Sequence, residues 1–156
     1  MARIEHFNNP NAPKPNSIVV AVTVFVQDEQ GRVLLIQRTD NGLWALPGGA
    51  QDFGEYIAET AVRETREETG VEIEVISVVG IYTNPNHVVE YSDGGARQEF
   101  SICFRGRYIG GAPTTSDESS AVRWVAQEEL EDLSIHPSMR LRIDHGFEQR
   151  GEPYIG

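Results

Sequence analysis

A change of hydrophobic period in the first half of the chain constrains the fold more than any other feature. Between residues 55 and 69, small or partly apolar side chains recur at the spacing of one helix face, at Ala58, Ala61, Val62, Thr65 and Thr69. Gly70 follows directly, and glycine is common just past a helix because it accepts a left-handed backbone. The pattern predicts an α-helix over residues 55–69.

The rest of the chain mixes strand patterns with one more helix. Five runs rich in β-branched or apolar residues predict strands, over residues 17–26, 32–38, 71–82, 97–109 and 121–125. The first two flank a turn and predict a hairpin, and a last helix is expected from about Pro137 to Gly146. Because helices and strands do not alternate regularly, we expect an α+β fold, an α/β/α sandwich around a mixed β-sheet.

The chain length of 156 residues suits one domain. Residues 1–16 are polar and contain three prolines, which predicts an extended N-terminal arm, and residues 17–150 are expected to form a single domain. Cys103 is the one cysteine, which excludes an intrachain disulfide. No signal peptide or long apolar stretch is visible, so we expect a cytoplasmic protein without a membrane partner.

The formal net charge of −11 argues against a nucleic-acid polymer as partner, because such proteins present a basic face to phosphates. A small phosphorylated ligand remains compatible with an acidic protein if a cation lies between them. A homodimer is left open, since the proline-rich arm could pack on a neighbouring subunit.

Three glutamates lie on one side of the predicted helix. Glu64, Glu67 and Glu68 are spaced i, i+3 and i+4, which places them about one turn apart and away from the apolar stripe. Clustered carboxylates suit Mg²⁺ or Mn²⁺, which prefer oxygen ligands and bridge to phosphates. Geometry alone favours a simpler interpretation, a solvated charged face with Arg63 offsetting the acids.

The wider pattern changes that balance. Gly49 is followed at fixed intervals by charged and glycine positions, at Glu55, Arg63, Glu64, Glu67, Glu68 and Gly70, with Val71 at the end. This segment resembles the signature box of the Nudix hydrolase superfamily (MutT-like), and the preceding residues 44–49 resemble the usual lead-in. Thr65 stands where an aliphatic residue is usual, but it lies on the core-facing stripe and so concerns packing.

The resemblance implies a loop, helix and loop that present a divalent cation, Mg²⁺ or alternatively Mn²⁺, to a pyrophosphate. Glu67 and Glu68 would be the main metal ligands, and Glu64 a ligand or the base that prepares the attacking water. Arg63 would orient the glutamates. The resemblance also implies roles for Glu55 in steadying the box and for a backbone carbonyl of Gly48 or Gly49 on the metal.

Residues outside the box complete the expected site. A further acid often joins the metal site in this family, and Glu118 ranks ahead of Glu99 and Asp117 because it directly precedes the strand that holds Trp124. Four residues are candidates for binding substrate, by phosphate contact or by stacking on a base: Arg38, Trp44, Tyr82 and Arg97. Each aromatic candidate also fits an ordinary core position.

The resemblance implies a Mg²⁺-dependent hydrolase acting on a small nucleotide, a nucleoside diphosphate linked to another group, as in ADP-ribose or a nucleotide sugar. Pro85 lies near a position where a proline accompanies ADP-ribose as substrate in some relatives, and an ordinary loop proline is the alternative interpretation. A nucleoside triphosphate is the alternative substrate. A third hypothesis is a regulator that binds nucleotides without hydrolysing them. Such members of the family commonly lose glutamates of the signature box, and this chain keeps them.

Overall fold

The computed structural model describes residues 3–156. Within them, ten strands follow one another as β1 Arg3–Phe7, β2 Ser17–Gln27, β3 Val33–Arg38, β4 Trp44–Ala45, β5 Gly48–Ala50, β6 Glu72–Tyr82, β7 His87–Tyr91, β8 Ala96–Gly110, β9 Ser119–Val125 and β10 Tyr154–Ile155. The helices are α1 Ile57–Thr69, a 3₁₀ helix Gln127–Asp132 and α2 Pro137–Glu148. Neither α-helix is long and apolar enough to cross a membrane.

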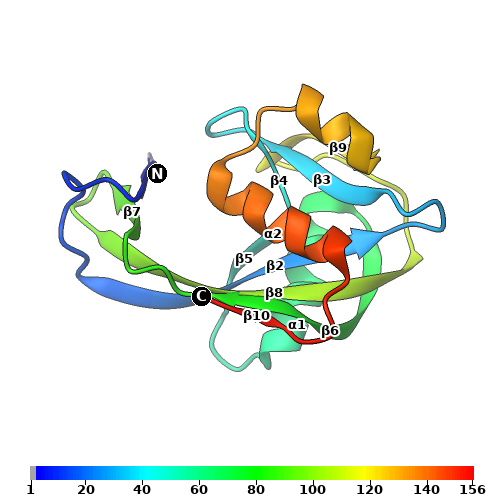
Figure 1. Ribbon diagram of the computed structural model, residues 1–156, viewed down its shortest axis with the longest axis horizontal. Helices are drawn as coiled ribbons and strands as arrows, with labels where there is room; N and C mark the ends of the chain where they lie inside the picture. Colours follow the sequence, from blue (N-terminus) through cyan, green and yellow to red (C-terminus); the bar gives the residue numbers. More distant parts are fainter. Residues whose placement is uncertain (1–2) are drawn as a thin grey trace.

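The long strands β2 and β8 join the parts of the sheet. They run parallel, from Ser17 beside Arg97 to Gln27 beside Arg107. At its other edge β8 pairs antiparallel with β7 and then with β6, while β2 pairs with β5 and, at its end, with β3. The sheet is therefore mixed, as predicted, and β7 and then β1 extend it beyond β8 (Figure 1).

Helices cover both faces of this sheet (Figure 1). Alternate residues of a strand point to opposite faces, so β2 contributes Val24 to a core cluster with Ala61 of α1, and Phe25 to a second cluster with Ile143 of α2. The sheet thus lies between two apolar layers. This arrangement confirms the predicted α/β/α sandwich.

The local signals of α1 are confirmed. The helix begins at Ile57, two residues after the predicted start, and ends at Thr69 as predicted. Gly70 has a φ of 75°, and its N–H donates to the carbonyl oxygen of Arg66 at 2.9 Å. A left-handed glycine therefore stops the helix. Thr65, the departure from the family pattern, is fully buried against the core.

Long-range pairing also produced strands outside the five segments that the sequence predicted as strands. The predicted hairpin of β2 and β3 is confined to one pair, Gln27 beside Val33, because β3 leaves to pair with β9. Residues 39–54 contain β4 and β5, which are too short to show a period. Part of the expected N-terminal arm forms β1, which pairs with β7; residues 1–2 of the arm lie outside the described range. Past residue 150, the short strand β10 pairs with β6.

Candidate active site

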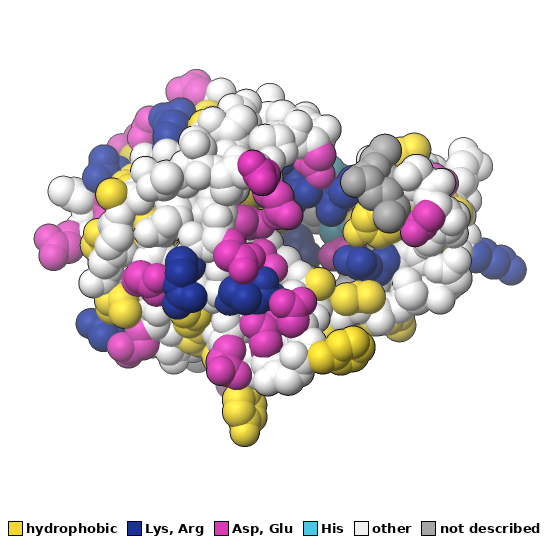
Figure 2. Space-filling model, turned by 180° about the vertical axis from the view of Figure 1, so that it is seen from behind, with side chains coloured by type: hydrophobic (Ala, Val, Ile, Leu, Met, Phe, Trp, Pro, Cys, Tyr) yellow, Lys and Arg dark blue, Asp and Glu magenta, His cyan; other side chains and the backbone are white. Residues whose placement is uncertain are grey.

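Three carboxylates from two elements meet beside β5. Glu64 and Glu68 lie one turn apart on α1, and Glu118 lies just before β9; each offers an oxygen within 4.8 Å of the others. The backbone N–H of Thr39 donates to the carbonyl oxygen of Glu118 at 3.2 Å, which ties that residue to the end of β3. Figure 2 shows acidic side chains gathered on the rim of a hollow. We call Glu64, Glu68 and Glu118 the carboxylate group.

Glu68 is the buried member of this group, with 4% of the residue exposed. Its side chain accepts a hydrogen bond from the backbone N–H of Gly48 at 3.0 Å, and its own carbonyl accepts one from Ser119 at 2.6 Å. Burial raises the pKa of Glu68 to about 8; the bond from Gly48 opposes this rise, and the charges of Glu64 and Glu118 add to it. Without a cation, this position disfavours the ionised carboxylate.

Arg63 holds the neighbouring acids in place. Its Nη1 donates to Glu64 at 2.8 Å, its Nε to Glu55 at 2.6 Å and its Nη2 to the carbonyl oxygen of Ala50 at 3.2 Å. The hydrogen bond from Arg63 is the main reason that the pKa of Glu55 is lowered to about 2. Burial raises the pKa of Glu64 although Arg63 acts against it. One arginine therefore joins the loop, β5 and the helix.

Glu67 lies outside the carboxylate group. Its side chain is 57% exposed, and its Oε2 accepts from Arg63 at 3.2 Å. This contact follows from the i, i+4 spacing. The proposed ligand role of Glu67 stays a prediction, while Glu118, named as the acid outside the box, does lie beside Glu64 and Glu68.

The two glycines of β5 permit close packing. A Cβ atom on Gly48 would overlap the carbonyl oxygen of Val22, because β5 pairs with β2 at this point. A Cβ atom on Gly49 would lie 2.5 Å from the carboxyl carbon of Glu64. Glycine is thus required at Gly48 by the neighbouring strand and at Gly49 by a site carboxylate.

The carboxylate group fits a divalent cation. Carboxylate oxygens are the hard ligands that Mg²⁺ and Mn²⁺ prefer. Three ionised carboxylates this close repel one another, and burial adds the cost of removing the charged Glu68 carboxylate from water. A cation bound here would relieve both penalties.

The candidate substrate-binding residues separate into two kinds. Arg38 and Arg97 line a cleft that begins at Gly48 and Gly49. Trp44 and Tyr82 are core residues, 9% and 6% exposed. Burial leaves little of either ring free to stack on a ligand, and stacking by these residues stays a prediction that the geometry does not favour.

Each buried ring has a local partner instead. The guanidinium carbon of Arg123 lies 5.4 Å from the ring centre of Trp44. The hydroxyl of Tyr82 is 2.8 Å from Nδ1 of His145. These contacts match the core interpretation of both aromatics.

Sequence reasoning missed Arg142, which lines the same cleft from α2. A signal was available, because Met139, Arg142, Ile143 and Gly146 recur at i, i+3, i+4 and i+7, so that an arginine occupies the core-facing stripe of the helix. It is 4% exposed. A charged residue on such a stripe needs a partner or a function.

Comparison with known proteins identifies the family. The model of the NUDIX domain matches residues 18–145, most of the chain. The chain belongs to the Nudix family. A "MutT-like protein" from Streptomyces ambofaciens is 36% identical over 121 residues, 78% of this chain and 72% of the relative. A "Putative 8-oxo-dGTP diphosphatase" from Bacillus subtilis is 35% identical over 122 residues, 78% of this chain and 74% of the relative.

Two further proteins show the range of the Nudix family. An "ADP-ribose pyrophosphatase" from Methanocaldococcus jannaschii is 33% identical over 126 residues, 76% of this chain and 63% of the relative. The crystal structure of an ADP-ribose pyrophosphatase from Streptococcus suis superposes with a TM-score of 0.70 at 22% identity, covering 88% of this chain and 98% of the other. This likeness confirms the Nudix fold, and family membership confirms the prediction of a Nudix pyrophosphohydrolase.

Proposed function

We propose that this Nudix hydrolase cleaves the pyrophosphate of a nucleoside diphosphate linked to another group, with Mg²⁺ as its cofactor. The proposal rests on one observation: the carboxylates of Glu64, Glu68 and Glu118 lie close together beside the backbone of Gly48. These carboxylates supply oxygen ligands from two elements, and Gly48 beside them also lines a cleft with arginines in its wall. The relative named as an ADP-ribose pyrophosphatase supports the substrate class.

The chemistry needs a cation and a base in one place. A divalent ion bound at the carboxylate group would neutralise charge on the pyrophosphate and lower the pKa of bound water. Glu64 is proposed to accept the proton of the attacking water; its hydrogen bond from Arg63 and the rise of its pKa through burial support this role. Arg38 and Arg97 are proposed to contact the substrate phosphates or the group beyond them.

A nucleoside triphosphate is the second candidate substrate, supported by the relative named as a putative 8-oxo-dGTP diphosphatase. Products separate the two. A diphosphate-linked substrate releases two phosphorylated halves, whereas a triphosphate cleaved to its monophosphate releases free pyrophosphate. Incubating the protein with a nucleotide panel and Mg²⁺, and identifying the products by mass, decides between them. Hydrolysis of no member would contradict the proposal.

Single substitutions test which acids serve the site. We expect Glu68→Gln to lower turnover by at least about 10²-fold, since it removes a charged ligand next to the reacting group. Glu74→Gln is the matched control, because Glu74 is 59% exposed and pairs with Arg107 on the surface. Glu67→Gln tests the metal-ligand role that the family resemblance implies for Glu67. A loss of turnover equal to that of Glu68→Gln would support a ligand role, whereas a much smaller loss would support a role as partner of Arg63.

A further inference from the structure

The cleft beside the carboxylate group is a small cavity with a basic lining. Its volume is about 120 Å³, and it is bounded by β5, by residues 21–23 of β2 and by α2. Four arginines and two glutamates provide its charged lining: Arg3, Arg38, Arg97, Arg142, Glu5 and Glu99. We call this space the basic cavity. Figure 2 shows Lys or Arg and His side chains within the hollow beside the acidic rim.

Arg142 is the most enclosed of these arginines. Its Nη1 donates to the carbonyl oxygen of Ser138 at 2.7 Å, and its guanidinium carbon lies 4.7 Å from the ring centre of Tyr82. Its Nε has no hydrogen-bond partner and it has no ion pair within residues 3–156. Burial lowers the pKa of Arg142, while the charges of Glu99 and Glu5 act in the opposite direction. A buried donor without an acceptor is rare and asks for an explanation.

The neighbouring carboxylates form no hydrogen bond with Arg142. Glu99 is near enough for its charge to raise the pKa of Arg142, but within residues 3–156 the two side chains make no hydrogen bond or ion pair. Glu5 is engaged by His87 at 2.6 Å and by Arg3 at 3.2 Å. Arg38 forms two hydrogen bonds with Asp40. Two basic groups of the lining therefore remain without a carboxylate partner in the described residues, Arg142 and Arg97.

Arg97 contributes a second free cation. Its guanidinium carbon lies 5.1 Å from the ring centre of Tyr91, and no carboxylate of residues 3–156 pairs with it. Free donors therefore face the cavity from β8 and α2.

We propose that the basic cavity binds a second anionic group of the substrate, a phosphate or a carboxylate separate from the hydrolysed pyrophosphate, with Arg142 as its main donor and Arg97 assisting. This inference rests on the proposed function and narrows its substrate class. Gly48 lines the cavity and its N–H also donates to Glu68 of the carboxylate group, so one molecule can reach both places. Its volume of about 120 Å³ is enough for such a group.

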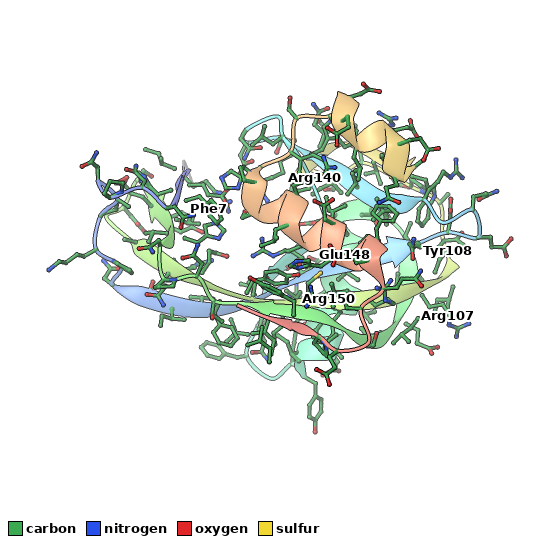
Figure 3. All side chains as sticks on the ribbon, in the orientation of Figure 1. Phe7, Arg107, Tyr108, Arg140, Glu148 and Arg150 are labelled. Atoms are coloured by element: carbon green, nitrogen blue, oxygen red, sulfur yellow. The ribbon has the colours of Figure 1, made fainter. Side chains whose placement is uncertain are left out.

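Binding without metal tests the cavity separately from catalysis. We expect the wild-type protein, in the presence of a chelator, to bind inorganic phosphate in calorimetry, and Arg142→Met to weaken that affinity at least about tenfold because it removes charge-assisted donors. Arg140→Met is the matched control, since Arg140 (labelled in Figure 3) lies on the same helix and pairs with Glu131 and Asp144. Equal affinity of wild type and Arg142→Met overturns the proposal.

A second variant tests the proposal if Arg142→Met does not fold. Circular dichroism establishes whether Arg142→Met keeps the fold. If it does not, Arg97→Met on β8 takes its place, with an expected loss of several-fold in phosphate affinity. An unchanged affinity in a folded Arg97→Met, together with an unfolded Arg142→Met, counts against the proposal.

Matched substrates test the selectivity. UDP-glucose and UDP-glucuronic acid differ by a carboxylate, and NADH and NADPH differ by a phosphate, so the two pairs distinguish the two anions. We expect the wild type to prefer the acidic member of one pair by about tenfold or more in kcat/KM, and Arg142→Met to lose that preference.

The two proposals fail in different ways. Equal rates within both pairs, unchanged in Arg142→Met, overturn the selectivity while hydrolysis itself stands. Hydrolysis of neither pair nor of any other nucleotide, with phosphate binding that Arg142→Met abolishes, contradicts the proposed function and leaves the cavity as an anion site.

Discussion

Replacing Gly49 by alanine should damage the site while leaving the fold intact. Gly49 has no left-handed backbone, so alanine is compatible with its conformation. The added Cβ atom would lie 2.5 Å from the carboxyl carbon of Glu64, whereas ordinary contacts begin at about 3.4 Å. The obstacle is the end of a flexible side chain. The carboxylate of Glu64 must therefore retreat by about 1 Å.

That displacement sets the magnitude. A misplacement of about 1 Å at a reacting group costs roughly 10²-fold in rate. Glu64 would leave both its hydrogen bond with Arg63 and its place beside Glu68. We expect kcat to fall about 10²-fold and the affinity for Mn²⁺ to fall with it, while the melting temperature changes little.

Two other glycines provide the comparison. Gly48→Ala should lower the stability as well as the rate, because its Cβ atom would overlap the backbone of β2 and its N–H holds Glu68; such overpacking costs about 1–3 kcal/mol or more. Gly110→Ala is the neutral control, since nothing lies within 4 Å of its added Cβ atom. The assays are initial rates with the best nucleotide, Mn²⁺ titration by electron paramagnetic resonance, and thermal unfolding. Wild-type rate and Mn²⁺ affinity in Gly49→Ala would refute the reasoning.

Two further predictions concern stability. Burial opposes ionisation of Glu5, but the hydrogen bond from His87 and nearby positive charges lower its pKa to about 2. Its ionised form should stabilise the protein by about 3 kcal/mol above pH 4.5, and this contribution is lost as the pH falls toward 2. In urea unfolding, Glu5→Gln should therefore show a smaller loss of stability over this pH range than the wild type. Parallel curves of stability against pH for the two proteins would contradict the prediction. Gly146→Ala places a Cβ atom against the ring of Phe25 and should lower the free energy of unfolding by about 1–3 kcal/mol, measured by the same method; an unchanged value would show that α2 shifts freely.

Local physics explains what could be read from the sequence. The helix over residues 57–69, its stop at Gly70 and the shared side of Glu64 and Glu68 follow from a 3.6-residue period and from the backbone freedom of glycine. The main strands follow from runs of β-branched residues. None of these features needs a partner distant in the chain, so the sequence by itself determined them.

Tertiary structure decided the rest. Glu118 joins Glu64 and Glu68 only because β9 pairs with β3, and β1 forms only because residues 87–91 lie beside it. The free donor of Arg142 in the basic cavity depends on packing of α2 against the sheet, which no local period encodes. Pairing and burial between distant segments are properties of the folded chain, and this site is completed by such contacts.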